Sequence, residues 1–137
     1  MIRNKEYHAH FVDFTGLQFD KISPMDFDAF LEFGDKLFIF IETKYKTDVM
    51  PIGQELAIQR LCDACQTENR TSIAFLTRHD VAVGEGNIIL ADSIVVKYRY
   101  KGEWQIPKEE TKLSTAVTRM VERYGKCPKM KNNTTID

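Results

Sequence analysis

The sequence predicts an α/β domain with a mixed central sheet, an antiparallel hairpin and flanking helices. The chain has 137 residues, which fits one domain. Apolar residues make up 43% and charged residues 28%, an ordinary globular composition. The apolar pattern alternates between strand-like runs and helix-like stripes, so both element types share one core. We expect this single domain over residues 1–125 and a disordered polar tail over 126–137.

The segment 1–20 is mixed and aromatic, and its pattern is the least decisive. Residues 7–12 fit either an irregular strand or the end of a helix. His8 and His10 would share one face of such a strand, but no third metal ligand accompanies them. We therefore expect a structural role for both histidines.

The next part of the chain predicts a hairpin. Residues 26–33 are rich in Phe, 34–36 form a turn, and 37–44 begin with a five-residue apolar run. Such a run is typical of a strand buried on both faces. Because the connection is so short, the two strands must be antiparallel.

A helix from about Ile52 to Glu68 follows, with a strand at 72–77. Gln54, Ile58, Leu61 and Cys65 lie on one helical face, which we expect to contact the sheet. A strand, a helix and a second strand in this order predict a right-handed crossover between parallel strands.

The second half predicts further strands and a second helix. We expect Gly125 to follow that helix as its C-terminal cap residue. The expected elements are a loop at 79–87, a short edge strand at 88–91, a strand with one solvated face at 92–100, a return strand at 103–106 and a helix at 113–124.

Charge and cysteine content exclude some classes of protein. Lys and Arg number 19 and Asp and Glu 20, a balance that neither indicates nor excludes nucleic acid.

The longest apolar run is far below the roughly 20 residues of a membrane-spanning helix, and no signal peptide is apparent, so we expect a cytoplasmic protein. Three cysteines do not make a disulfide framework. Cys62 and Cys65 lack a second ligand pair for zinc, so we expect them in the core.

Four charged residues suggest a catalytic site on the hairpin. Asp26 and Asp28 would lie on one face of the first strand, and Glu42 and Lys44 on one face of the second. Antiparallel pairing then brings Asp28 and Glu42 together, with Lys44 beside them.

A carboxylate and an ammonium at the end of such a buried strand would be costly if unpaired, and two adjacent carboxylates repel each other. A divalent cation between the carboxylates would remove both problems. Mg²⁺ binds one or two carboxylates, and the carbonyl of Thr43 could be a further ligand. Lys44 could orient or deprotonate the attacking water. Gln54, in the first turn of the helix, would point into the same site. This set suits phosphodiester hydrolysis.

These residues resemble the PD-(D/E)XK nucleases, a superfamily that includes restriction endonucleases and Holliday-junction resolvases. Thirteen residues separate Asp28 from Glu42-Thr43-Lys44. The Pro24-Met25-Asp26-Phe27-Asp28 segment, the apolar strand and Gly53-Gln54 are similar to small phage-encoded, resolvase-like members. The resemblance covers about residues 22–65.

The resemblance implies a restriction-endonuclease-like core and a Mg²⁺-dependent endonuclease, with Mn²⁺ as a substitute. Asp28 and Glu42 would bind the metal, Asp26 being a less favoured addition, while Lys44 would be catalytic and Gln54 would support it. DNA is the expected substrate, with branched DNA among the candidates. Two copies could pair, since small members of the superfamily often form dimers.

Basic residues are the expected nucleic-acid contacts. Lys46 continues the face of Glu42 and Lys44, and Arg78 lies near the site, so both could bind phosphate. Basic residues on the 92–100 strand and its turn fit either a solvated face or a phosphate-tracking surface; these are Lys97, Arg99 and Lys101. Two alternatives stay open: a non-catalytic nucleic-acid or protein-binding module on a nuclease fold, and an RNA-directed nuclease.

Overall fold

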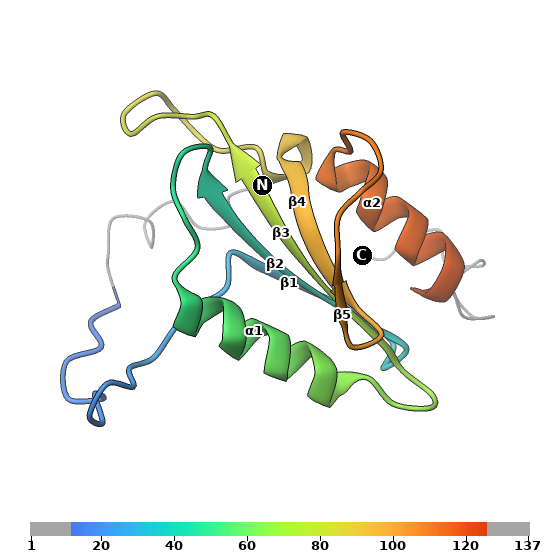
Figure 1. Ribbon diagram of the computed structural model, residues 1–137, viewed down its shortest axis with the longest axis horizontal. Coiled ribbons are helices and arrows are strands. Elements are labelled where there is room, and N and C mark those ends of the chain that lie inside the picture. Colours follow the sequence, from blue (N-terminus) through green and yellow to red (C-terminus); the bar gives the residue numbers. More distant parts are fainter. Residues whose placement is uncertain (1–11, 126–137) are drawn as a thin grey trace, which may run out of the picture.

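The computed structural model describes residues 12–125 and has one five-stranded sheet with a helix on each face (Figure 1). The strands lie in chain order, and only β2 and β3 are parallel. This confirms the mixed sheet flanked by helices. The bounds are β1 Ala29–Phe33, β2 Leu37–Tyr45, α1 Ile52–Cys65, β3 Thr71–His79, β4 Ile94–Tyr100, β5 Glu103–Gln105 and α2 Leu113–Met120.

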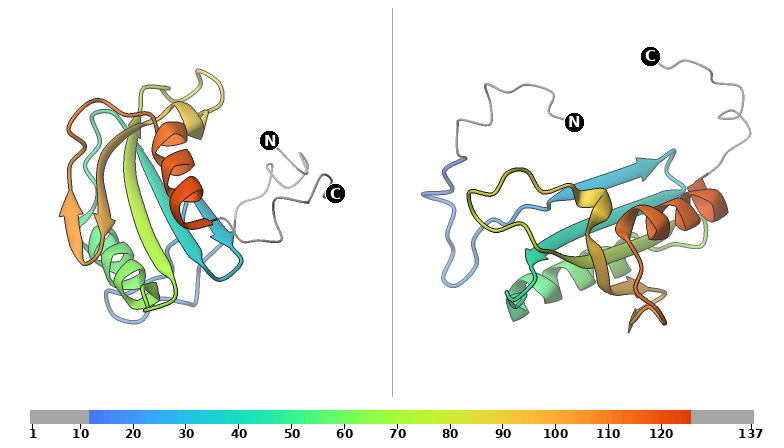
Figure 2. Two further views of the ribbon diagram at one scale, coloured as in Figure 1. Left: turned by 90° about the vertical axis from the view of Figure 1, so that its right-hand side faces the viewer. Right: turned by 90° about the horizontal axis from the view of Figure 1, so that it is seen from above.

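Two apolar clusters hold the helices to the sheet, one on each face. Along β2, alternate residues point to opposite faces. Ile39 and Ile41 pack with Phe75 toward α2, whereas Phe40 packs with Ile58 toward α1. The two faces are seen edge-on in Figure 2, with α1 and α2 on opposite sides. The strand is therefore buried on both faces, as its apolar run predicts.

The β1–β2 hairpin is antiparallel, as predicted, but its first strand is shorter. Pairing begins at Ala29 opposite Ile41, so Asp26 and Asp28 precede β1 instead of lying within it. The Asp28 carboxylate accepts a hydrogen bond from the backbone N–H of Thr43 at 2.7 Å. A side chain thus replaces the backbone partner at this end of the hairpin.

The crossover helix α1 connects the parallel strands β2 and β3, as the sequence predicts. Its contact face is shifted from the expected one. Ile58 and Cys62 are buried against the sheet, while Leu61 is 37% exposed. The helix also ends at Cys65, before the predicted Glu68, because the chain turns back there and the Arg70 guanidinium donates to the Cys65 carbonyl at 3.2 Å.

The prediction that one face of β4 is solvated is wrong. Lys97 pairs with Glu55 of α1 at 2.8 Å, and Arg99 pairs with Asp63 at 2.7 Å. Both cations also lie over the ring of Trp104. These basic side chains hold α1 against β4, which a sequence pattern without the helix could not reveal.

Three smaller expectations also change or fall outside the structure. The segment 88–91 forms no strand; a short 3-10 turn, Leu90–Asp92, stands there. Gly125 closes a π-helical turn, Val121–Gly125, where an added Cβ would lie 3.3 Å from Val121. The histidines at 8 and 10, residues 7–11 and the 126–137 tail lie outside the described residues.

Within residues 12–125, no helix has the length and apolar character needed to cross a membrane.

Candidate active site

Glu42 is a buried carboxylate near the end of an apolar strand. Only 6% of the residue is exposed. It follows Phe38 and Phe40 on the face of β2 that α1 covers, so the alternation of the strand directs it toward the start of that helix.

The two carboxylate oxygens of Glu42 have different surroundings. Oε2 accepts a hydrogen bond from the Gln54 side-chain amide at 3.0 Å, and the Lys44 ammonium lies 3.5 Å from it. Oε1 is buried and has no hydrogen-bond partner among the described residues. A buried oxygen without a partner is costly to the fold, which is a reason to ask what it binds.

Asp28 brings a second carboxylate to this position. Its hydrogen bond to Thr43 holds it beside the strand that carries Glu42. The pKa of the Glu42 carboxyl is raised above its ordinary value, first by burial and second by the negative charge of Asp28. The Lys44 ammonium opposes this shift. The site is therefore short of positive charge.

The structure thus brings together four of the residues predicted from the sequence: Asp28, Glu42, Lys44 and Gln54. Asp26 is not linked to them: within the described residues, it forms no hydrogen bond or salt bridge with the other four.

A hollow of about 380 Å³ adjoins the cluster, and both predicted phosphate contacts line it. Arg78 is the β3 neighbour of Lys44, and its half-exposed guanidinium lies 3.9 Å from Glu110. Lys46 does not continue the strand face as expected, because β2 ends at Tyr45. Its ammonium instead lies 5.8 Å from the centre of the Tyr45 ring.

Glu55 is a residue of this hollow that the sequence did not single out. It lines the hollow together with Lys97, to which it is paired. Residues 55, 58 and 62 are spaced as neighbours on a helix. Glu55 thus lies at the N-terminal end of the buried face of α1, and this spacing could have identified Glu55 from the sequence.

The residues present fit a hard divalent cation with an incomplete ligand shell. No group of three or more His, Cys, Asp or Glu residues able to hold a metal occurs within residues 12–125. Two carboxylates and a backbone carbonyl are nevertheless usual for Mg²⁺, which keeps several waters or binds substrate phosphates. The free Oε1 of Glu42 is the strongest indication, since a cation would satisfy it.

No protein-family model, curated protein or solved structure matches this chain. The chemistry of the four clustered residues is therefore the basis for inferring a function.

Proposed function

We propose that this protein is a Mg²⁺-dependent endonuclease that hydrolyses phosphodiester bonds in DNA. The observation that carries the proposal is Glu42, which is buried, has one oxygen without a partner and lies beside Asp28. A buried carboxylate beside a second, exposed one, with only one ammonium nearby, is an arrangement that a cation would stabilise.

Each residue of the cluster has a role in this proposal. Asp28, Glu42 and the carbonyl of Thr43 would hold the cation, which when bound neutralises phosphate charge and makes a water more acidic. Gln54 fixes the rotamer of Glu42 through its hydrogen bond at 3.0 Å. Asp26 is omitted from the ligand set because, unlike Asp28, it has no hydrogen bond to the strand that carries Glu42 within the described residues.

Lys44 is placed to act on the reacting groups. Its side chain is 30% exposed, so the ammonium can reach solvent or a bound phosphate from the hollow. At this position it can hold the attacking water or stabilise the charge that develops on the phosphate.

The surroundings of the cluster favour a nucleic acid. Lys46 and Arg78 line the same hollow as Lys44, and such side chains bind phosphate without reading sequence. The hairpin, crossover helix and parallel strand follow the order expected of a restriction-endonuclease-like core. We include branched DNA as a substrate and a homodimer as the cutting form in the proposal.

A panel of substrates tests the proposal. Duplex, single-stranded, flapped and four-way DNA, together with RNA, are incubated with the protein and Mg²⁺ or Mn²⁺. We expect metal-dependent cleavage of DNA that is lost in Asp28→Asn and retained in Asp26→Asn, its matched control.

The other outcomes separate the alternatives. Cleavage of RNA alone would replace the DNA proposal with an RNA-directed nuclease. Binding without cleavage of any substrate, in either metal, would overturn the enzymatic proposal in favour of a non-catalytic binding module.

A further inference from the structure

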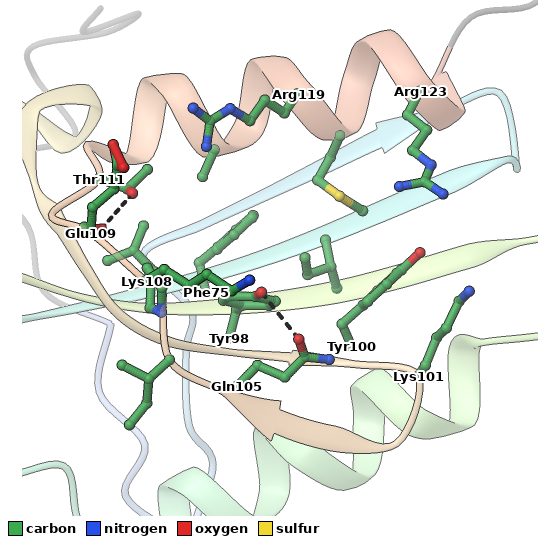
Figure 3. A pocket seen from close by; sticks show the side chains of 16 residues that line it. Phe75, Tyr98, Tyr100, Lys101, Gln105, Lys108, Glu109, Thr111, Arg119 and Arg123 are labelled. Atoms are coloured by element: carbon green, nitrogen blue, oxygen red, sulfur yellow. Dashed lines mark hydrogen bonds between the residues drawn. The ribbon is translucent and has the colours of Figure 1, made fainter.

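A second cavity, of about 580 Å³, lies between α2 and the β3–β5 part of the sheet (Figure 3). Its walls include Ile73, Phe75 and Val95, which belong to the cluster that packs against α2. Glu42 points to the opposite face of the sheet, so this cavity is separate from the candidate active site. Its volume is typical of a small-ligand pocket.

The inner wall of the cavity is apolar and aromatic. The rings of Phe75 and Tyr98 lie with their centres 6.1 Å apart, and Tyr100 continues this wall along β4. Ala116 and Met120 of α2 face them across the cavity. A flat apolar group would find aromatic rings on one side and aliphatic side chains on the other.

The rim of the cavity carries an excess of positive charge. Four cationic side chains line it against one carboxylate, Glu109; they are Lys101, Lys108, Arg119 and Arg123. None of the four takes part in a salt bridge with another described residue.

Arg119 and Arg123 are the most informative members of this rim. Arg119 lies in α2 and Arg123 in the π-helical turn that follows it. Both line the cavity, with the Arg119 guanidinium pointing toward the Thr111 end and that of Arg123 toward the Tyr100 end (Figure 3). A bound anion could accept charge-assisted hydrogen bonds from the cationic side chains of this rim.

Gln105 supplies a directional polar contact inside the cavity. Its carbonyl oxygen accepts a hydrogen bond from the Tyr98 hydroxyl at 3.2 Å. That bond orients the side chain and leaves the amide nitrogen as a donor without a partner among the described residues. A ligand with a ring carbonyl or ring nitrogen could accept from it.

We propose that this cavity binds a nucleoside monophosphate group, with its base against Tyr98 and Tyr100 and its phosphate among the cationic side chains of the rim. An aromatic wall, a fixed amide donor and a cationic rim match a base, its polar edge and a phosphate. A fatty acid would use the charge but neither the rings nor the amide. The group could be a free nucleotide or the terminal nucleotide of a strand. This site does not depend on the proposed nuclease activity.

Calorimetric titration of the full chain tests the site. The probes are AMP, UMP, adenosine, inorganic phosphate, dodecanoate and a 5′-phosphorylated single-stranded hexanucleotide. We expect a monophosphate to bind at least tenfold more tightly than adenosine or phosphate, about 1.4 kcal/mol. Stronger binding of the hexanucleotide assigns the site to a strand end, and equal or weaker binding assigns it to the free nucleotide.

Two variants and one control locate the binding. Arg119→Glu reverses a rim charge, and Ala116→Trp fills the cavity; each should weaken nucleotide binding at least tenfold. Arg60→Glu alters an exposed arginine on α1 and should leave it unchanged. Thermal unfolding checks that each variant folds.

The proposal is overturned if neither monophosphate nor the hexanucleotide binds, or if dodecanoate or phosphate alone binds as tightly. It is also overturned if nucleotide binding survives in both cavity variants.

Discussion

Glu42 is the residue at which the fold and the proposed chemistry meet. Its burial beside Asp28 makes the ionised carboxylate unfavourable in the metal-free protein. The Gln54 amide donates a hydrogen bond to Oε2 of Glu42 and the Lys44 ammonium lies near the same oxygen, whereas Oε1 has no partner among the described residues. Burying a carboxylate with one unsatisfied oxygen lowers the free energy of unfolding, and such a loss of stability is typical of functional sites.

The first prediction concerns the pH dependence of stability. The folded-state pKa of Glu42 is raised from 4.5, so the folded protein binds this proton more tightly than the unfolded chain. The free energy of unfolding therefore falls as the pH rises from 4.5, the ordinary pKa of the carboxyl, through the raised pKa of Glu42 in the folded protein. Without metal, Glu42→Gln should be more stable than the wild type at about pH 7, and the difference should vanish near pH 4.

Urea unfolding in EDTA at both pH values checks this expectation, with the exposed Glu68→Gln as control. Added Mg²⁺ should then stabilise the wild type more than Glu42→Gln, because a ligand stabilises the state that binds it. A wild-type protein more stable than Glu42→Gln at neutral pH in EDTA would contradict this account of the site.

The second prediction separates Lys44 from Lys46. Lys44 lies 3.5 Å from Glu42, whereas Lys46 lies beyond the end of β2 and is exposed. Lys44→Ala should lower the single-turnover cleavage rate roughly 10²-fold and weaken binding little. Lys46→Ala should weaken binding and reduce the salt slope by about 1, with near-normal cleavage once bound.

Binding and single-turnover rates for both lysine variants decide this. If Lys44→Ala cuts at the wild-type rate once bound, Lys44 is a docking residue and has no part in the chemistry.

At the scale of elements, α1 positions the site and fastens it to the sheet. Gln54 in its first turn holds Glu42, Ile58 and Cys62 fill its buried face, and Asp63 near its end holds Arg99. Movement of this helix would therefore disturb the site even though most of its contacts lie away from Glu42.

The third prediction tests the packing of α1. Burial raises the pKa of the Cys62 thiol to about 11, so it should remain protonated and unreactive in the folded protein. Iodoacetamide at about pH 8 should alkylate the less buried Cys65 well before Cys62. Because the folded pKa is raised, stability should also fall as pH rises from 9 toward 11.

Peptide mass spectrometry over time measures the two alkylation rates. Equal rates for Cys62 and Cys65 in the folded protein would show that α1 opens readily, contrary to the packing described.

The sequence predicted those elements whose pattern depends on near neighbours. The hairpin and the crossover follow from run length and a short turn, and they are sufficient to bring Asp28, Glu42, Lys44 and Gln54 together. The start of β1 was missed because a side chain, that of Asp28, replaces a backbone partner there. The prediction of a solvated face on β4 was wrong because Glu55 and Asp63 of α1, which are distant in the sequence, form salt bridges with the basic side chains of that face.

At the scale of the whole molecule, the single sheet separates two candidate ligand sites. One lies under the start of α1 and the other under α2, on opposite faces (Figure 2). No sequence pattern predicted the second, because its walls come from β3, β4, β5 and α2. Only the folded arrangement brings those residues to one cavity.

The most direct test of the central claim is single-turnover DNA cleavage by the wild type and Glu42→Gln at saturating protein, with Mg²⁺ and with EDTA. The account predicts Mg²⁺-dependent cleavage by the wild type and a rate at least roughly 10²-fold lower for a folded Glu42→Gln. Cleavage by Glu42→Gln at the wild-type rate would contradict it.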